Sequence, residues 1–143
     1  MSPTLPPEFA VALELLGSLN APINPPLFSS IRFAAYAGTL TILRNEKEDA
    51  IGFVCWAAGN KESVRIADQF NLFPTRLWEF KEGKIAMLLF VYFLYPFNEQ
   101  AKKAFRGFLA DHRAVYYAKK DKKRLIVRTS NGFKAARLVK RPA

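Results

Sequence analysis

The chain has 143 residues, half of them hydrophobic, which suits one domain with a buried core of its own. It carries a formal net charge of +10, a single cysteine (Cys55) and a single histidine (His112), so an internal disulfide and a cysteine-based metal site are excluded, and few histidine-dependent catalytic or metal sites are left. The N-terminal segment lacks a signal-peptide pattern and the longest apolar run is too short for a bilayer, so we expect a cytoplasmic protein, or one carried inside an assembly, without a membrane span.

Two helices are predicted in the first forty residues. Apolar residues at helical spacing follow a pair of prolines and stop near Gly17, which predicts a helix over about 7–18. A proline-rich turn comes next. The stretch "LFSSIRFAAYA" then predicts a second helix over about 27–37, ended by Gly38.

A hairpin and a short helix are predicted in the middle of the chain. The β-rich runs "TLTILR" and "AIGFVCWA" flank the polar turn "NEKED", a pattern typical of two antiparallel strands. Asn60 is placed to cap a helix formed by "KESVRIADQF". The segment "NLFPTRLWEFKEGK" after it is expected to be a long connection with aromatic anchors.

Eleven residues from Ile85 to Tyr95 contain no charge and are bounded by Gly83 and Pro96. Their aromatic and β-branched content and their lack of polar alternation predict a central strand covered on both faces. We expect both faces to be largely buried, with one formed by Ile85, Met87, Leu89 and Val91 and the other by Leu88, Phe90 and Tyr92.

The C-terminal third predicts a helix, a hairpin and a basic extension. The stretch "NEQAKKAFRGFLADH" is typical of a helix capped by Asn98, and "RAVYYAKKDKKRLIVRTS" of a hairpin around "KKDKK". Residues 130–143 have too few apolar side chains for a core, so we expect them to leave the domain formed by residues 1–129 and to bind a partner. The alternative is that they add a strand to the sheet edge.

Several of these segments together resemble the toxin-activating lysine acyltransferases of the haemolysin-activating type, over roughly residues 13–130. The segments that carry the resemblance are "LFSSIRFAAYAGTLTILRNEKEDAIGFVCWA", "FVYFLYPF", the basic helix after it and "RAVYYAKKD". The resemblance implies an α+β fold similar to the N-acetyltransferases, with a mixed sheet flanked by helices. It also implies transfer of a fatty acyl group from acyl carrier protein to a protein lysine, often by a dimer. Relatives of this family are encoded in tailed phages.

The two catalytic positions of that family are replaced in this chain. Asn24 stands where the resemblance places a histidine, and Tyr92 where it places an aspartate, so we expect a distant member without the family's proton transfer. Inherited geometry predicts that these two residues face one another. Neither His112 nor Cys55 is a good substitute, because a lone histidine at a helix end is usually a surface residue and a cysteine in a strand usually a core residue.

Positive charge is concentrated after residue 118 and suggests partners for this region. We expect partner contacts from the basic residues Lys119, Lys120, Lys122, Lys123, Arg124, Lys134, Arg137, Lys140 and Arg141.

Three functions remain open. The first is a catalytically degenerate binding or structural component of a larger assembly such as a phage virion, associated with other proteins or with itself. The second is an active lysine acyltransferase that uses acyl carrier protein. The third is a non-specific nucleic-acid binder. No cofactor or metal is expected, and the chain has no "GxGxxG" loop for a nucleotide pyrophosphate.

Overall fold

The computed structural model of the chain describes residues 5–119, 122–129 and 132–136. In these residues a mixed sheet of six strands, in the order β1-β2-β3-β4-β5-β6, is flanked by four α-helices, and a short 3-10 helix spans Leu77–Phe80. The α+β class and the mixed sheet flanked by helices are as predicted. None of the described helices has the length and apolar character that crossing a membrane requires.

The first two helices are α1, Pro7–Ser18, and α2, Pro25–Ala37. The second begins two residues earlier than predicted, because its two prolines occupy the first turn, where a missing backbone N–H breaks no helical hydrogen bond. It ends at Gly38, whose φ of 77° is the left-handed conformation that favours glycine.

The predicted hairpin and the helix after it are confirmed. Strands β1, Leu40–Arg44, and β2, Ala50–Gly59, pair antiparallel. Helix α3, Lys61–Phe70, begins with a capping box in which the Asn60 side chain accepts a hydrogen bond from the backbone N–H of Ser63.

Strand β3, Ile85–Phe93, pairs antiparallel with β2 along its whole length. The pairing contains a bulge, because Cys55 lies opposite Phe90 and Trp56 opposite Leu88, which leaves Leu89 without a partner on β2.

The bulge makes the predicted division of β3 into two faces wrong. Leu88 packs in the cluster beneath the fourth helix, whereas Phe90 and Tyr92 pack in the cluster formed by α1 and α2. One extra residue reverses the side to which every later side chain points. The predicted burial holds only for the first half of the strand, since Ala86 and Met87 are 0% exposed and Val91 is 37% exposed.

Helix α4, Glu99–Ala110, leads from β3 to β4, Ala114–Lys119, which lies parallel to β3. Strand β5, Lys122–Thr129, and strand β6, Gly132–Ala136, continue the sheet as an antiparallel meander. Residues 132–136 therefore add a strand to the sheet edge, which is the alternative that we considered for the C-terminal extension. The rest of the predicted extension, 130–131 and 137–143, lies outside the described residues.

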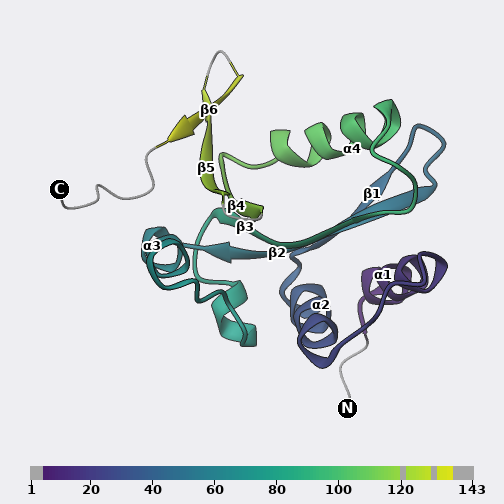
Figure 1. The fold of residues 1–143 in the computed structure, drawn as a ribbon, viewed down its shortest axis with the longest axis horizontal. Coiled ribbons are helices and arrows are strands. Elements are labelled where there is room, and N and C mark those ends of the chain that lie inside the picture. Colours follow the sequence, from purple (N-terminus) through teal and green to yellow (C-terminus); the bar gives the residue numbers. More distant parts are fainter. Residues whose placement is uncertain (1–4, 120–121, 130–131, 137–143) are drawn as a thin grey trace.

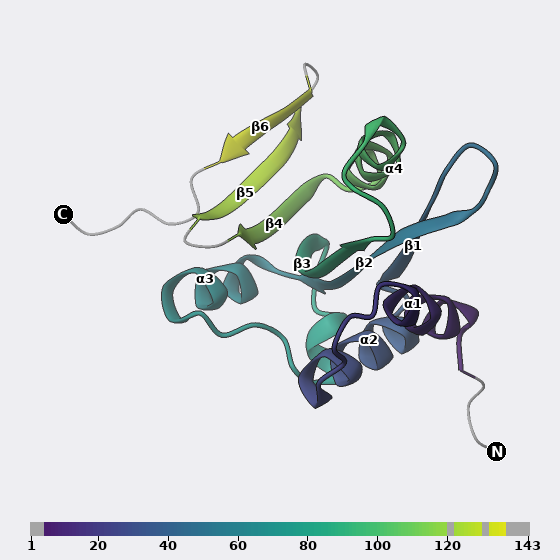
Figure 2. The same cartoon turned by 45° about the vertical axis from the view of Figure 1, so that its right-hand side comes forward.

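Helices cover the two faces of the sheet unequally, as Figure 1 shows: α4 lies on one side, and α1, α2 and α3 lie on the other. In Figure 2 the meander of β4, β5 and β6 turns away from the plane of β1, β2 and β3. The larger core packs α1 and α2 against β1 and β2 and includes the fully buried Leu16, Ile31 and Phe53. The second core packs Phe108 of α4 against Val54 and Leu88.

Candidate functional site

Asn24, the residue at the expected histidine position, is the N-cap of α2. Its side-chain oxygen Oδ1 accepts a hydrogen bond of 2.8 Å from the backbone N–H of Leu27. This bond satisfies one of the N–H groups that the first turn of a helix leaves without a partner. The side chain therefore has a structural task that a neutral amide performs well.

Tyr92, the residue at the expected aspartate position, is part of a hydrophobic cluster. It is partly buried, and its ring stacks on Phe53 with centroids 5.3 Å apart. It lies on the α1 and α2 side of the sheet, and α2 begins on that side with Asn24. The two positions thus share a face of the sheet, and the contacts of each stabilise the fold; that the two side chains face one another stays a prediction.

His112 and Cys55 both lie in aromatic or buried surroundings. The ring of His112 is 4.6 Å from the rings of both Trp56 and Phe108, and burial lowers its pKa while the charge of Asp111 opposes the shift. Cys55 is 0% exposed, and burial raises the pKa of its thiol to about 12. A thiol that stays protonated is a poor nucleophile, so Cys55 is a core residue as predicted.

The basic residues predicted to bind partners are divided between described and undescribed parts of the chain. Lys119 belongs to β4, Lys134 belongs to β6, and β5 carries Lys122, Lys123 and Arg124. Their role in partner binding stays a prediction. The others, Lys120, Arg137, Lys140 and Arg141, lie outside the described residues.

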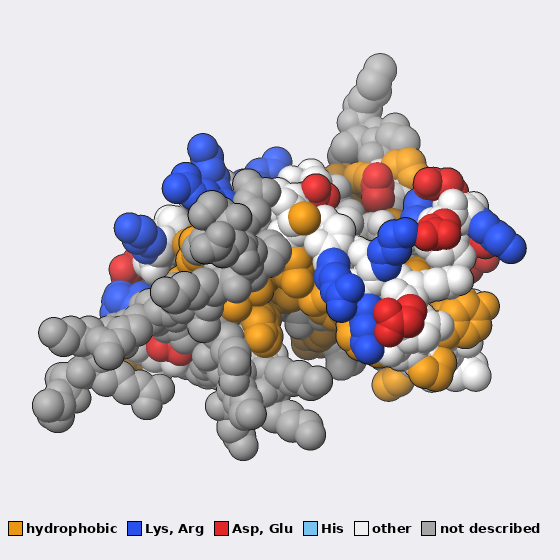
Figure 3. All heavy atoms as spheres, turned by 90° about the horizontal axis from the view of Figure 1, so that it is seen from above, with side chains coloured by type: hydrophobic (Ala, Val, Ile, Leu, Met, Phe, Trp, Pro, Cys, Tyr) orange, Lys and Arg blue, Asp and Glu red, His pale blue; other side chains and the backbone are white. Residues whose placement is uncertain are grey.

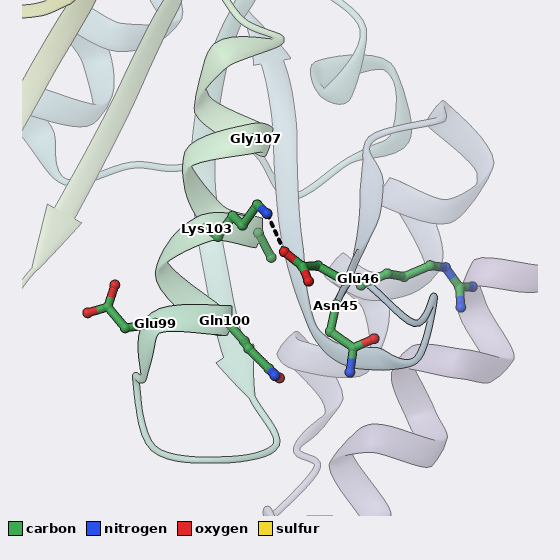
Figure 4. Close-up of a pocket in the computed structure, with 8 residues that line it drawn as sticks. Asn45, Glu46, Glu99, Gln100, Lys103 and Gly107 are labelled. Atoms are coloured by element: carbon green, nitrogen blue, oxygen red, sulfur yellow. Dashed lines mark hydrogen bonds and ion pairs between the residues drawn. The ribbon is translucent and has the colours of Figure 1, made fainter.

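A polar cleft of about 490 Å³ separates the β1–β2 turn from one flank of α4. In Figure 4, Lys103 of α4 points toward Glu46 of the turn, and the two form an ion pair. Arg44 donates a hydrogen bond to the carbonyl of Glu48, and the side chain of Asn45 accepts two from backbone N–H groups of its own turn. These polar groups hold the hairpin turn and α4 in place, so we assign the cleft a structural role.

The parallel pairing of β3 and β4 is very short and creates a second, apolar cavity. Among the described residues, only two pairs join the strands, Ala86 with Val115 and Met87 with Tyr116. Beyond Met87 the strands separate, and a groove of about 580 Å³ occupies the space between them on the α4 side. Its lining is almost wholly hydrophobic and consists of Leu88, Leu89, Phe90, Val91, Phe93, Phe97, Phe105, Leu109, Tyr117, Ala118 and Ile126.

A further cavity lies near the same segments of β3 and β4. This cavity, of about 300 Å³, is smaller and lies on the opposite face, beside Ser30 and Thr75. It shares four lining residues with the groove, namely Leu88, Leu89, Phe90 and Ala118. Because these residues belong to β3 and β4, the two cavities lie beside the same segments of the two strands.

Aromatic side chains surround one end of the groove. Phe97, which is 53% exposed, has its ring 5.0 Å from that of Phe93 and 6.5 Å from that of Phe105. Figure 3 shows this side of the molecule, where hydrophobic side chains gather in a hollow with Lys and Arg side chains beside it. An apolar groove of this size matches the usual dimensions of a small-molecule site.

Sequence reasoning considered an acyl groove lined by Phe90, Tyr92, Phe93, Tyr95 and Phe97 but favoured a core strand, because aromatic residues in a central strand are usually core. Three of these residues, Phe90, Phe93 and Phe97, line the groove. The available signal was the extension of the stretch past the strand, where Tyr95 and Phe97 are 60% and 53% exposed. Within the part of the chain that the structure describes, no group of histidine, cysteine, aspartate or glutamate side chains is arranged to hold a metal ion. Comparisons of the chain with protein-family models, with curated proteins and with solved structures gave no match.

Proposed function

We propose that the protein is a catalytically inactive acyltransferase-like protein that binds an extended apolar chain, such as a fatty acyl group, as a binding component of a larger assembly. The observation that carries this proposal is the separation of β3 from β4 after two residue pairs, which leaves a hydrophobic groove between them. Isolated apolar surface of this extent is unfavourable in water, so a bound alkyl chain would stabilise it.

The backbone of the groove supports an elongated ligand. Beyond Met87, the edge of β3 that faces β4 has no partner in the described sheet, and the facing edge of β4 beyond Tyr116 is equally unpaired. Unpaired strand edges present N–H and C=O groups that an extended chain with amide groups can bind. A thioester of pantetheine offers both features, because its arm contains amides and its acyl group is apolar.

The two replaced catalytic positions support binding without transfer. Asn24 uses its side-chain oxygen to cap α2, and Tyr92 packs against Phe53. Removing a proton from a lysine ammonium requires a base, and an amide has no basic site at neutral pH. An active lysine acyltransferase, the second function compatible with the sequence, would therefore need a base that neither position supplies.

The test is a titration with the neutral thioester S-dodecanoyl-pantetheine, followed by calorimetry. We expect saturable binding to the whole chain, and a loss of at least about tenfold in affinity for Val91→Trp, because an indole placed on the groove floor would occupy the alkyl site. Ile23→Trp is the matched control: Ile23 is also partly exposed, at 44%, and lies outside the groove.

Two outcomes would contradict the proposal. Equal losses for both tryptophan variants, or the absence of binding to the native chain, would show that the groove is not the ligand site. Acylation of an added lysine amide, detected by mass spectrometry and abolished by Tyr92→Phe, would show that the protein is an enzyme after all.

A further inference from the structure

Three phenylalanine side chains lie together at one end of the groove, and each of them is part of its lining. They come from three separate segments: Phe93 ends β3, Phe97 lies in the loop after it, and Phe105 belongs to α4. The ring centroids are 5.0 Å apart for Phe93 and Phe97, 6.3 Å for Phe93 and Phe105, and 6.5 Å for Phe97 and Phe105. Each ring therefore contacts the other two, and we call the three rings the aromatic triangle.

The direction of the chain places the aromatic triangle at the end of the groove farthest from the two pairs that join β3 and β4. These pairs involve Ala86 and Met87, near the start of β3, whereas Phe93 is its last residue. Helix α4 runs back along β3 in the opposite direction, as Figure 1 shows, because it connects β3 to the parallel strand β4. The groove is therefore closed by strand pairing at one end, and the aromatic triangle stands across the other.

Phe97 is the outermost member of the aromatic triangle. Its side chain is 53% exposed, whereas Phe93 and Phe105 are partly buried. A phenylalanine that only filled the core would be buried, as large hydrophobic side chains of a core usually are. The ring of Phe97 instead contacts the other two rings and remains open to water, so it separates this end of the groove from solvent.

The distribution of polar groups indicates how an acyl chain would lie in the groove. Among the described lining residues, Tyr117 is the only one whose side chain carries a polar group. It follows Tyr116, the partner of Met87, so it lies near the paired end. The aromatic triangle offers only hydrocarbon, and an amide placed there would lose its hydration without gaining a partner. The methyl end of an acyl chain therefore suits the triangle.

We infer that Phe97 is a specificity-determining residue that limits the length of the acyl chain held between β3 and β4. From Leu88 to Phe93 the groove extends about 17 Å, because five residue steps of a strand cover about 3.3 Å each. An extended chain of single bonds advances about 1.2 Å per bond, so about fourteen bonds fit into this length. A dodecanoyl chain is shorter than this limit and an octadecanoyl chain is longer. This inference rests on the proposed function, because it concerns the same groove.

The experiment is equilibrium dialysis with three radiolabelled probes, S-octanoyl-, S-dodecanoyl- and S-octadecanoyl-pantetheine, at concentrations at which each probe is monomeric. For the native chain we expect the affinity to rise at least about tenfold from octanoyl to dodecanoyl, because every added methylene is buried, and to rise no further for octadecanoyl. Phe97→Ala should raise the affinity for octadecanoyl relative to dodecanoyl by at least about tenfold, because the added methylenes then pass the removed ring. Phe97→Trp should act in the opposite sense and weaken dodecanoyl relative to octanoyl.

Tyr95→Ala is the matched control. Tyr95 is an aromatic residue of the same loop and is 60% exposed, but it does not line the groove. This variant should leave the three affinities in their native ratios. Equal changes for Phe97→Ala and Tyr95→Ala would overturn the inference, and so would a native affinity that keeps rising up to octadecanoyl.

The failure of this inference is distinguishable from the failure of the proposed function. If the native chain binds none of the three probes, both fail. If it binds them at a site that Val91→Trp blocks, but without a limit on chain length, the proposed function stands and only the role of Phe97 is wrong.

Discussion

Strand β3 has one edge that is fully paired and one that is mostly open, and the two edges give the same apolar stretch two different roles. On the β2 side, partners are found from Ile85 to Phe93 with a single bulge. On the β4 side, the part of the chain that the structure describes supplies partners only for Ala86 and Met87. The first half of the strand is therefore core from both sides, whereas the second half is core on one side and groove wall on the other.

This difference shows that a continuous apolar run does not by itself identify a core strand. Hydrophobic side chains are equally suited to packing against a neighbouring strand and to lining a ligand groove. The exposures distinguish the two uses, since Met87 is 0% exposed and Val91 37% exposed although they are only four residues apart.

The largest expected effect lies in the fully packed half. Met87→Ala should lower the free energy of unfolding by about 2–5 kcal/mol, because it leaves a cavity beside Tyr116 in a core that cannot collapse fully. Val91→Ala in the open half should cost less than about 1 kcal/mol, because its side chain is already partly in water. Urea unfolding followed by circular dichroism measures both. Similar losses for the two variants would remove the distinction between the halves.

The second effect tests how tightly the paired edge is closed. A Cβ atom added at Gly52 would meet the backbone carbonyl of Tyr92, so Gly52→Ala should destabilise the protein by roughly 1–3 kcal/mol. Gly107→Ala is the control, because nothing lies within 4 Å of its added Cβ and alanine favours the helix by about 0.5–1 kcal/mol. The two variants should shift the thermal midpoint in opposite directions, and a gain for Gly52→Ala would show that β2 and β3 are less closely packed than described.

A smaller effect is expected at the start of α2, on the face of the sheet away from the groove. Asn24→Ala should cost about 1 kcal/mol through loss of the helix cap, and Asn24→Asp should restore most of it because a carboxylate also accepts the Leu27 hydrogen bond. Binding of S-dodecanoyl-pantetheine should be the same for both variants. A loss of binding with unchanged stability would instead place Asn24 in the ligand site.

The smallest effect is a pH dependence at the end of α4. Burial lowers the pKa of His112 below its usual value of 6.5, so the folded protein favours the neutral ring. The neutral His112 ring therefore stabilises the folded protein at pH values above the pKa that His112 has in the unfolded chain. This stabilisation is lost as the pH falls from that value through the lower pKa of His112 in the folded protein. Between about pH 7 and pH 5 the native protein should therefore lose more stability than His112→Asn. Parallel losses measured by urea unfolding would show that the contacts with Trp56 and Phe108 do not disfavour the charged ring.

Local signals in the sequence predicted most elements of the fold. Side chains that cap helices act within three or four residues, so Asn60 and Asn98 marked the starts of α3 and α4, and Gly38 marked the end of α2. The bulge at Leu89 was not predictable in this way, because it depends on how β2 and β3 align, and the register of two strands is a tertiary property.

The candidate site was less predictable than the fold for a related reason. Whether β3 has a neighbour beyond Met87 is decided by the pairing of Val115 and Tyr116, which lie after the whole of α4. The helical spacing of Phe105, Phe108 and Leu109 places these side chains on the inner side of α4, and two of them, Phe105 and Leu109, line the groove. Helical periodicity thus identified side chains that line the groove, but it did not predict that the groove exists.

The short pairing between β3 and β4 also makes the width of the groove sensitive to a small rotation. The two residue pairs lie at one end of the separating strands, so they act as a pivot from which the other end is displaced most. From Met87 to Phe93 the strand extends about 20 Å at about 3.3 Å per residue, so turning the β4–β6 meander by about 10° would change the far opening by about 3.5 Å. That change is close to the diameter of an alkyl chain, and it would break no strand pairing outside the pivot.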